Sequence, residues 1–205
     1  MRTALSLLAL IVPFVFGGCG GCGKEEAFTP TKELLSESIV REGDTWRLQF
    51  TSRIEAPVDL VFQTWTAVPE RSRELAPDYF LKSEIVSQEG NKKVVDVVGK
   101  SDILPPGFKV QDLRLEYTAY PEQKKIVGRT VDFKLADWTM EYTFAPSDDG
   151  RATIVTFKQT SKDKAPLIVE SLQKGALRET YVRQVQLVNK ALGLEGGAAP
   201  ARPQG

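Results

Sequence analysis

The sequence predicts an α+β fold in which a seven-stranded antiparallel sheet packs against one long C-terminal helix. Two features carry this prediction. Between residues 46 and 159, short segments with alternating apolar and polar side chains are separated by turn residues, which is typical of strands joined by hairpins. Residues 166–192 then carry apolar side chains at spacings of three and four, which indicates an amphipathic helix. We therefore expect the dry face of the sheet to pack against this helix.

The first predicted strand is followed by helices that begin at prolines. Residues 46–54 place their large apolar side chains on one face: Trp46, Leu48, Phe50 and Ile54. Proline is tolerated at the first position of a helix, so Pro57 is expected to open a short helix. Pro69 is expected to open a second short helix, and Pro77 to end it.

The same alternation predicts six further strands, at residues 80–87, 93–100, 112–120, 125–131, 138–144 and 152–159. Turn residues lie where hairpins need them, at residues 89–91, 121–123 and 148–150. Gly193 follows the last helix and is expected to end it, because glycine is common just past a helix C-terminus.

Both ends of the chain are predicted to lie outside the folded domain, which spans residues 45–194. Residues 1–18 have a basic start and an uncharged apolar run at residues 4–16, too short for a transmembrane helix of about 20 residues. This pattern predicts a secretory signal peptide. Residues 19–44 are predicted to form a tether, and residues 195–205, which are rich in Gly, Ala and Pro, a disordered tail.

A cysteine follows the apolar run of the signal peptide. The segment Gly17-Gly18-Cys19 resembles the lipobox of bacterial lipoproteins, in which the cysteine becomes the diacylated first residue of the mature chain. The resemblance implies a membrane-anchored protein of the bacterial cell envelope. Because Gly20, not Asp, follows the cysteine, it implies the outer membrane, facing the periplasm. The alternatives are lipidation at Cys22, an ordinary signal peptide, or a redox or metal pair of the two cysteines.

The composition excludes several classes of function. The chain has no histidine, so Ser-His-Asp catalysis, Cys-His catalysis and histidine-ligated metals are excluded. Its 27 Lys and Arg residues balance 27 Asp and Glu residues, whereas a nucleic-acid binder needs a basic face. We therefore expect no metal, no cofactor and no nucleic-acid partner.

Two motifs and the order of elements resemble a known superfamily. Residues 54–62, IEAPVDLVF, look like the passage from the first strand to the first helix in START-like helix-grip proteins. Residues 138–144 and 150–157 look like the last two strands of that fold. The superfamily (SRPBCC) includes polyketide cyclases and coenzyme Q-binding START domains. The resemblance covers roughly residues 45–192 and implies a sheet curved around the long helix, with an internal cavity for a hydrophobic ligand.

The inward-facing apolar residues are the candidate cavity wall: Trp46, Phe50, Leu113, Leu115, Tyr117, Trp138, Met140, Tyr142, Leu172 and Ala176, with Tyr181 as a further candidate. Alternation alone does not distinguish a wall from a solid core, and each residue could instead fill the core. The small pair Gly175-Ala176 in the helix favours a space, although close packing of the helix on the sheet would need the same residues. Leu104 and Phe108 lie in a stiff proline-containing loop, which is predicted either to form a gate at the cavity mouth or to be pinned against the core.

Catalytic candidates are few. Asp96 lies among valines and is the acidic residue with the best prospect of pointing inward, but it has no partner at a recognisable spacing. We therefore expect a binding protein that holds, and could transfer, a lipid, an isoprenoid or quinone, or a sterol-like compound beside a membrane. The alternatives are a cyclase or hydrolase acting through Asp96 or a tyrosine, and a structural envelope lipoprotein with a filled core.

Overall fold

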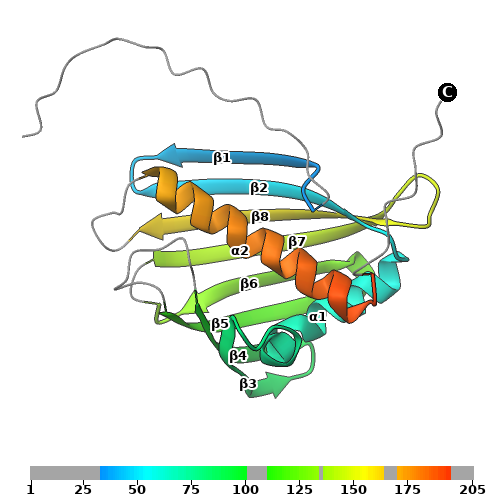
Figure 1. Cartoon of the computed structure of the whole chain (residues 1–205), viewed down its shortest axis with the longest axis horizontal. Helices are drawn as coiled ribbons and strands as arrows, with labels where there is room; N and C mark the ends of the chain where they lie inside the picture. The colour runs from blue at the N-terminus through cyan, green and yellow to red at the C-terminus, as the bar shows by residue number, and fades with distance from the viewer. Residues whose placement is uncertain (1–32, 101–109, 134–135, 164–169, 195–205) are drawn as a thin grey trace, which may run out of the picture.

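The computed structural model describes residues 33–100, 110–133, 136–163 and 170–194. Within them, an antiparallel sheet curves around a long helix (Figure 1), and its strands lie in the order β1-β2-β8-β7-β6-β5-β4-β3. The strands are β1 (Ser36–Glu42), β2 (Thr45–Ile54), β3 (Phe80–Glu89), β4 (Lys92–Lys100), β5 (Val110–Tyr120), β6 (Lys125–Val131), β7 (Ala136–Pro146) and β8 (Thr153–Asp163). The helices are α1 (Val58–Leu75) and α2 (Glu170–Ala191), and a short 3-10 turn, η2 (Pro121–Gln123), joins β5 to β6.

The described sheet has eight strands rather than the predicted seven. The seven predicted strands correspond to β2 to β8, and the additional strand, β1, lies in the segment that was predicted to be part of the tether. Its alternation is weak because β1 is a polar edge strand in which Ile39, opposite Leu48 of β2, packs against the core. An ion pair between Glu37 of β1 and Arg178 of α2 joins this edge to the helix. The folded domain therefore begins before residue 45.

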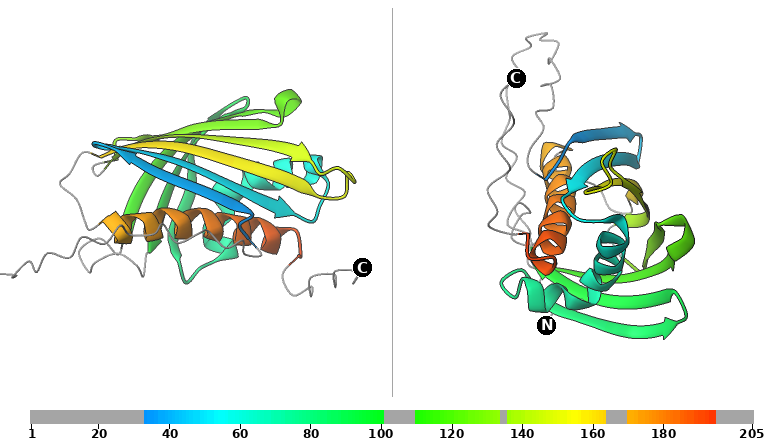
Figure 2. Two further views of the ribbon diagram at one scale, coloured as in Figure 1. Left: turned by 90° about the horizontal axis from the view of Figure 1, so that it is seen from above. Right: turned by 90° about the vertical axis from the view of Figure 1, so that its right-hand side faces the viewer.

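The two short helices expected after the first strand are one helix, α1, with Pro69 inside it. Proline lacks the N–H that would bond to the carbonyl of Trp65, one turn earlier, so a proline inside a helix kinks or breaks it. Here the Ser72 hydroxyl donates to the carbonyl of Val68 at 2.8 Å, and Ser83 of β3 donates to the carbonyl of Pro69. Figure 2 shows that α1 changes direction along its length.

The core lies where α2 crosses the concave face of the sheet (Figures 1 and 2). Phe50 of β2 and Phe157 of β8 are cross-strand partners, and both rings stack against Tyr181 of α2, with centroids 5.0 and 5.1 Å away. The Tyr181 ring also lies 6.5 Å from that of Trp65 in α1. This aromatic cluster joins both helices to the β2–β8 part of the sheet.

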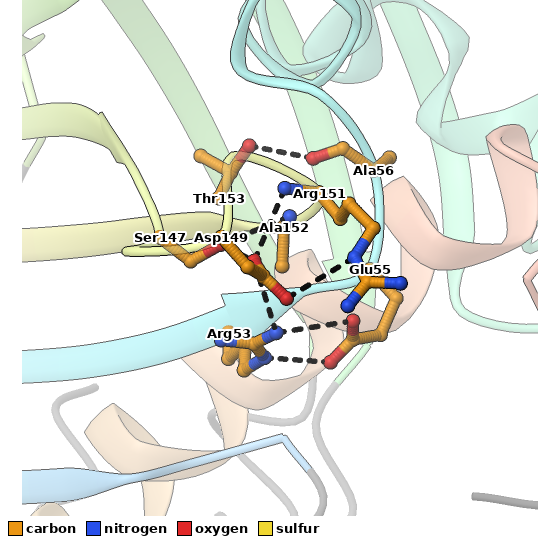
Figure 3. Close-up of polar contacts among 8 residues, drawn as sticks. All are labelled: Arg53, Glu55, Ala56, Ser147, Asp149, Arg151, Ala152 and Thr153. Atoms are coloured by element: carbon orange, nitrogen blue, oxygen red, sulfur yellow. Dashed lines mark hydrogen bonds and ion pairs between the residues drawn. The ribbon is translucent and has the colours of Figure 1, made fainter. Parts of the chain in front are cut away.

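Polar contacts hold the corner at which the chain leaves β2 for α1 (Figure 3). The buried hydroxyl of Thr153, at the start of β8, donates to the carbonyl of Ala56 at 2.8 Å. Arg53 pairs with Glu55 at 2.7 Å and, at 3.9 Å, with Asp149 of the turn between β7 and β8. These contacts set the point at which α1 begins and hence the position of Trp65.

Gly128 of β6 lies between Tyr117 of β5 and Met140 of β7, and we predict that a side chain at this position is destabilising. A Cβ atom there would lie 3.2 Å from the Glu116 carbonyl oxygen, the Tyr117 Cβ and the Met140 Cγ. We expect Gly128→Ala to lower the free energy of unfolding by about 1–3 kcal/mol through overpacking, as measured by urea denaturation.

Gly99 of β4 provides the matched control for this prediction. A Cβ at Gly99 would meet the Phe80 ring at 3.7 Å, an ordinary contact. Gly99→Ala is expected to be neutral or to stabilise by up to about 1 kcal/mol, because alanine restricts the unfolded chain. Equal stability of the two variants would contradict the account.

Candidate functional site

A cavity of about 190 Å³ lies between α2, α1 and the concave face of the sheet. Apolar and aromatic side chains from both helices and from β3 to β8 form most of its lining. An apolar cavity of about 150 Å³ can hold benzene, whereas sites for drug-sized ligands are about 300–1,000 Å³. The cavity therefore has room for one substituted ring or a compact pair of rings.

Six of the predicted wall residues line this cavity: Leu113, Leu115, Tyr117, Trp138, Met140 and Tyr142. They come from β5 and β7, and Tyr181 of α2 also lines it. Whether they contact a ligand stays a prediction.

Trp46 and Phe50 are not among the lining residues, contrary to the prediction. Both side chains are fully buried, Phe50 in the aromatic cluster with Phe157 and Tyr181, and Trp46 with the guanidinium of Arg41 5.2 Å from its ring. Both side chains lie on the same face of the sheet as the wall residues, but they are packed within the solid core and do not reach the cavity.

The other predicted site residues fall outside what the structure describes. Leu172 and Ala176 lie in α2, but their side chains are outside the described residues. The predicted gate residues Leu104 and Phe108 and the predicted lipidation site Cys19 lie outside them altogether, as do residues 1–18 and 195–205.

Several lining residues carry buried polar atoms that have no hydrogen-bond partner among the described residues. These include the indole nitrogen of Trp65, the hydroxyl of Tyr117 and the side-chain nitrogen of Gln159. All three atoms can donate a hydrogen bond. Leaving such a group unpaired costs about 1–3 kcal/mol, so each one calls for an acceptor such as a ligand oxygen or a water molecule.

The tyrosines at the cavity are neutral hydrogen-bonding groups. Burial raises the pKa of Tyr117 far above its ordinary value, and the charge of Glu70 raises it further. Burial likewise raises the pKa of Tyr142, whose hydroxyl donates to Gln184 of α2 at 2.8 Å. Burial also raises the pKa of Tyr181, whose hydroxyl has no hydrogen-bond partner among the described residues. Because their protons are held more tightly than in water, these hydroxyls are poor general bases and nucleophiles.

Asp96 points away from the cavity, so its expected inward orientation is wrong. Its neighbours Val95 and Val97 are buried at 0% and 6% exposure, and the alternation of β4 places Asp96 on the opposite face. There its carboxylate pairs with Arg114 at 2.7 Å and with Lys82 at 3.4 Å. The hydrogen bond from Arg114 is the main cause of its lowered pKa. Asp96 therefore belongs to an ion-pair network on the outer face.

Within the part of the chain that the structure describes, three charged residues line the cavity: Lys100 of β4, and Glu179 and Arg183 of α2. Lys100 is exposed, and the Glu179 and Arg183 side chains are 24% and 19% exposed. We call these three residues the cavity rim because water reaches all of them. Arg183 donates to Glu179 at 2.7 Å, and its guanidinium lies 3.1 Å above the ring of Tyr79.

Sequence reasoning missed the rim, Trp65 and Gln159. A usable signal existed for Gln159, which continues the inward phase of Phe157 with a polar side chain. Tertiary packing alone brings Arg183 next to Tyr79, because the two residues are far apart in the chain.

The described residues contain no cluster of three or more acidic, cysteine or histidine side chains placed to hold a metal ion. None of the described helices has both the length and the apolar character needed to cross a bilayer.

The sheet, the long C-terminal helix and the cavity between them define an α+β helix-grip fold, and comparison with solved structures supports this class. No protein-family model and no curated protein sequence matches the chain.

Three similar structures illustrate the likeness. The Zhui aromatase/cyclase from Streptomyces sp. R1128 has a TM-score of 0.61 at 14% identity, over 75% of this chain and 97% of that one. Ara h 8.0201 gives 0.58 at 11% identity, over 72% and 97%. Norcoclaurine synthase from Thalictrum flavum, in complex with dopamine and hydroxybenzaldehyde, gives 0.54 at 13% identity, over 79% and 91%. At these identities the likeness shows the fold alone.

We predict that Asp96 contributes to stability and not to the cavity. Asp96→Asn should lower the free energy of unfolding by about 1 kcal/mol at neutral pH, because it removes the carboxylate from a partly buried ion-pair network. The pKa of the Asp96 carboxyl is lower in the folded state than its ordinary value of 3.8, so the ionised carboxylate stabilises the fold at pH values above 3.8. This contribution is lost as the pH falls through the folded-state pKa. The difference between the variant and the wild type should therefore shrink below about pH 4 in denaturant titrations.

Asp112→Asn, at an exposed position of β5, is the control and should change stability little. A stability difference for Asp96→Asn that persists unchanged into acid would contradict the electrostatic account.

Proposed function

We propose that this protein binds a small hydrophobic molecule that carries hydrogen-bond-accepting oxygens, and holds it in the cavity. The main observation behind this proposal is that the residues lining an apolar cavity include Trp65, Tyr117 and Gln159, each with an unpaired hydrogen-bond donor. A ligand carbonyl or ether oxygen would satisfy these donors, and its rings would replace the missing contacts at the apolar wall.

The size of the cavity narrows the ligand classes expected from the sequence. A four-ring sterol or a complete lipid exceeds a space of about 190 Å³, given that one benzene ring occupies a cavity of about 150 Å³. The head group of a quinone, with its ring and carbonyl oxygens, suits both the volume and the donors. The similar norcoclaurine synthase, whose structure contains dopamine and hydroxybenzaldehyde, supports this choice at the level of the fold.

Binding is favoured over catalysis by the chemistry of the lining residues. Among the described residues that line the cavity, Glu179 is the one acidic residue, and it is paired with Arg183. The tyrosines hold their protons tightly, and Asp96 lies on the other face of the sheet. These observations support a carrier or storage role over a cyclase or hydrolase role.

A membrane anchor at Cys19 is the second part of the proposal, and its support is the lipobox-like segment of the sequence. A lipid chain on Cys19 would hold the domain close to a bilayer, from which an apolar ligand could be taken or to which it could be delivered. This arrangement is consistent with transfer of the ligand between the membrane and the cavity.

The donor hypothesis predicts a preference for oxygen-bearing ligands that depends on Tyr117. We expect the wild type to bind 2-acetylnaphthalene, which has a carbonyl acceptor, about five- to tenfold more tightly than naphthalene, as one net hydrogen bond gives. Tyr117→Phe should abolish most of this preference. Quenching of tryptophan fluorescence measures both affinities, because Trp65 and Trp138 line the cavity.

Tyr120→Phe, which alters an exposed tyrosine of the same strand, is the matched control and should keep the preference. The proposal fails if neither probe binds and native mass spectrometry finds no small molecule on protein purified from its source cells. An unchanged preference in Tyr117→Phe would remove this tyrosine from the site.

The anchor is tested by cysteine variants expressed in a bacterium. The wild-type chain is expected to fractionate with membranes and to incorporate a labelled fatty acid, and Cys19→Ser to lose both properties. Cys22→Ser is the matched control and should keep both. Loss in Cys22→Ser alone would move the anchor to that residue, and retention of the wild-type behaviour by both variants would exclude a cysteine-linked lipid.

A further inference from the structure

The buried polar groups of the cavity lining are unbalanced between donors and acceptors. Four lining residues have a buried side-chain atom without a hydrogen-bond partner among the described residues: Trp65, Tyr117, Gln159 and Tyr181. None of the four residues is more than 9% exposed. Each unpaired atom carries a proton, and the indole and amide nitrogens can only donate. The lining therefore has an excess of hydrogen-bond donors.

We propose that the cavity selects its ligand by oxidation state, and binds a ketone or quinone more tightly than the corresponding alcohol or hydroquinone. A carbonyl oxygen accepts two hydrogen bonds and brings no proton of its own. A hydroxyl group can accept at the same place, but it adds one donor to a lining that already has too many. This inference rests on the proposed function and specifies the kind of oxygen that the ligand carries.

The hydrogen bond between Tyr142 and Gln184 adds to the excess. The Tyr142 hydroxyl donates to the amide oxygen of Gln184 at 2.8 Å, and both residues line the cavity. This bond uses an acceptor of the lining for a proton of the lining, and it leaves the amide nitrogen of Gln184, which can only donate. The pair therefore offers a ligand more donors than acceptors.

A tyrosine oxygen could accept the proton of a ligand hydroxyl, but this contact does not restore the balance. Burial raises the pKa of Tyr117 far above its ordinary value, so the tyrosine keeps its own proton. That proton would still lack an acceptor, whereas a ligand carbonyl would accept it. An alcohol thus leaves one more buried donor unpaired than the ketone does, and an unpaired buried donor weakens binding.

The acceptors of Ser72 and Glu179 provide the competing explanation. The Ser72 hydroxyl donates to the Val68 carbonyl at 2.8 Å, so its oxygen could accept a ligand proton without leaving another donor unpaired. The Glu179 carboxylate, which Arg183 holds at the rim, could accept one as well. If a ligand hydroxyl used either acceptor, the ketone and the alcohol would bind equally. The ratio of their affinities therefore distinguishes the two explanations.

The first test compares a ketone and an alcohol that share one ring body and differ by two hydrogen atoms. The probes are 2-acetylnaphthalene and 1-(2-naphthyl)ethanol. We expect the full-length wild type to bind the ketone about five- to tenfold more tightly, as one additional unpaired donor gives. Isothermal titration calorimetry measures both affinities.

The second test uses a quinone with two carbonyl oxygens on one ring. The probes are tetramethyl-1,4-benzoquinone, whose methyl groups leave no unsubstituted ring carbon for a thiol to add to, and its hydroquinone, both measured without oxygen. The quinone is expected to bind more tightly. A tenfold preference would lower the midpoint potential of the bound two-electron couple by about 30 mV, which spectroelectrochemical titration measures.

Two glutamine variants test whether the unpaired donors cause the selectivity. Gln159→Met removes an unpaired donor at nearly constant volume and should lower the ratio of ketone to alcohol affinity several-fold. Gln49→Met is the matched control, because Gln49 is exposed on the neighbouring strand β2, and it should leave the ratio unchanged. The ratio is taken within one variant, so a loss of stability that affects both ligands equally does not change it.

The outcomes separate this inference from the proposed function. If the reduced member of either probe pair binds the wild type as tightly as the oxidised member, the selectivity is wrong and the hydrophobic binding site stands. A ratio that is unchanged in both Gln159→Met and Tyr117→Phe likewise overturns the inference. If no probe binds and native mass spectrometry finds no small molecule on protein purified from its source cells, the proposed function fails, and this inference fails with it.

Discussion

The Tyr181 ring sets how closely α2 can approach the sheet, and the cavity depends on this spacing. The ring packs over Phe50 and Phe157, so a full aromatic layer separates the helix from β2 and β8. Toward β4 and β6 the inner face carries smaller residues, including Gly99 and Gly128. A straight helix cannot follow this change in side-chain size, and an unfilled space remains at the small-residue end. The solid core and the cavity thus have one cause.

Much of the fold could be predicted because one face of the sheet is dry. Strands β2, β5 and β7 have apolar inner positions and polar outer ones, so alternation alone locates them. Strand β1 was not predicted because its edge position lets water reach most of its residues: Ile39 packs against the core, whereas its apolar neighbour Val40 is exposed, so no alternation results. Pro69 was taken for a helix start because a sequence does not show that Ser72 and Ser83 would support the carbonyls of a bent helix.

The site was harder to predict than the fold, for reasons visible in particular residues. The phase of a strand shows which side chains face inward but not what lies above them, so Phe50 in the core and Leu115 in the cavity wall looked alike. Asp96 lies between apolar residues on both sides, which leaves no alternation to follow. The phase of β4 determines its face: Val95 and Val97 point inward, and Asp96 pairs with its cross-strand partner Arg114 on the outer face. The contact between Arg183 and Tyr79 likewise exists only in the folded chain.

The two faces of the sheet treat their polar groups in opposite ways. On the outer face, carboxylates are paired with cations across strands, as in Asp96 with Arg114 and Glu116 with Arg129. At the cavity, Trp65, Tyr117 and Gln159 leave buried donors unpaired, although isosteric apolar residues would avoid that cost. Local rules of folding are obeyed where only stability is at stake, and departures from them gather at functional sites. The unpaired donors therefore support our proposal that a ligand binds in the cavity, because a ligand that supplies acceptors there would also stabilise the folded state that binds it.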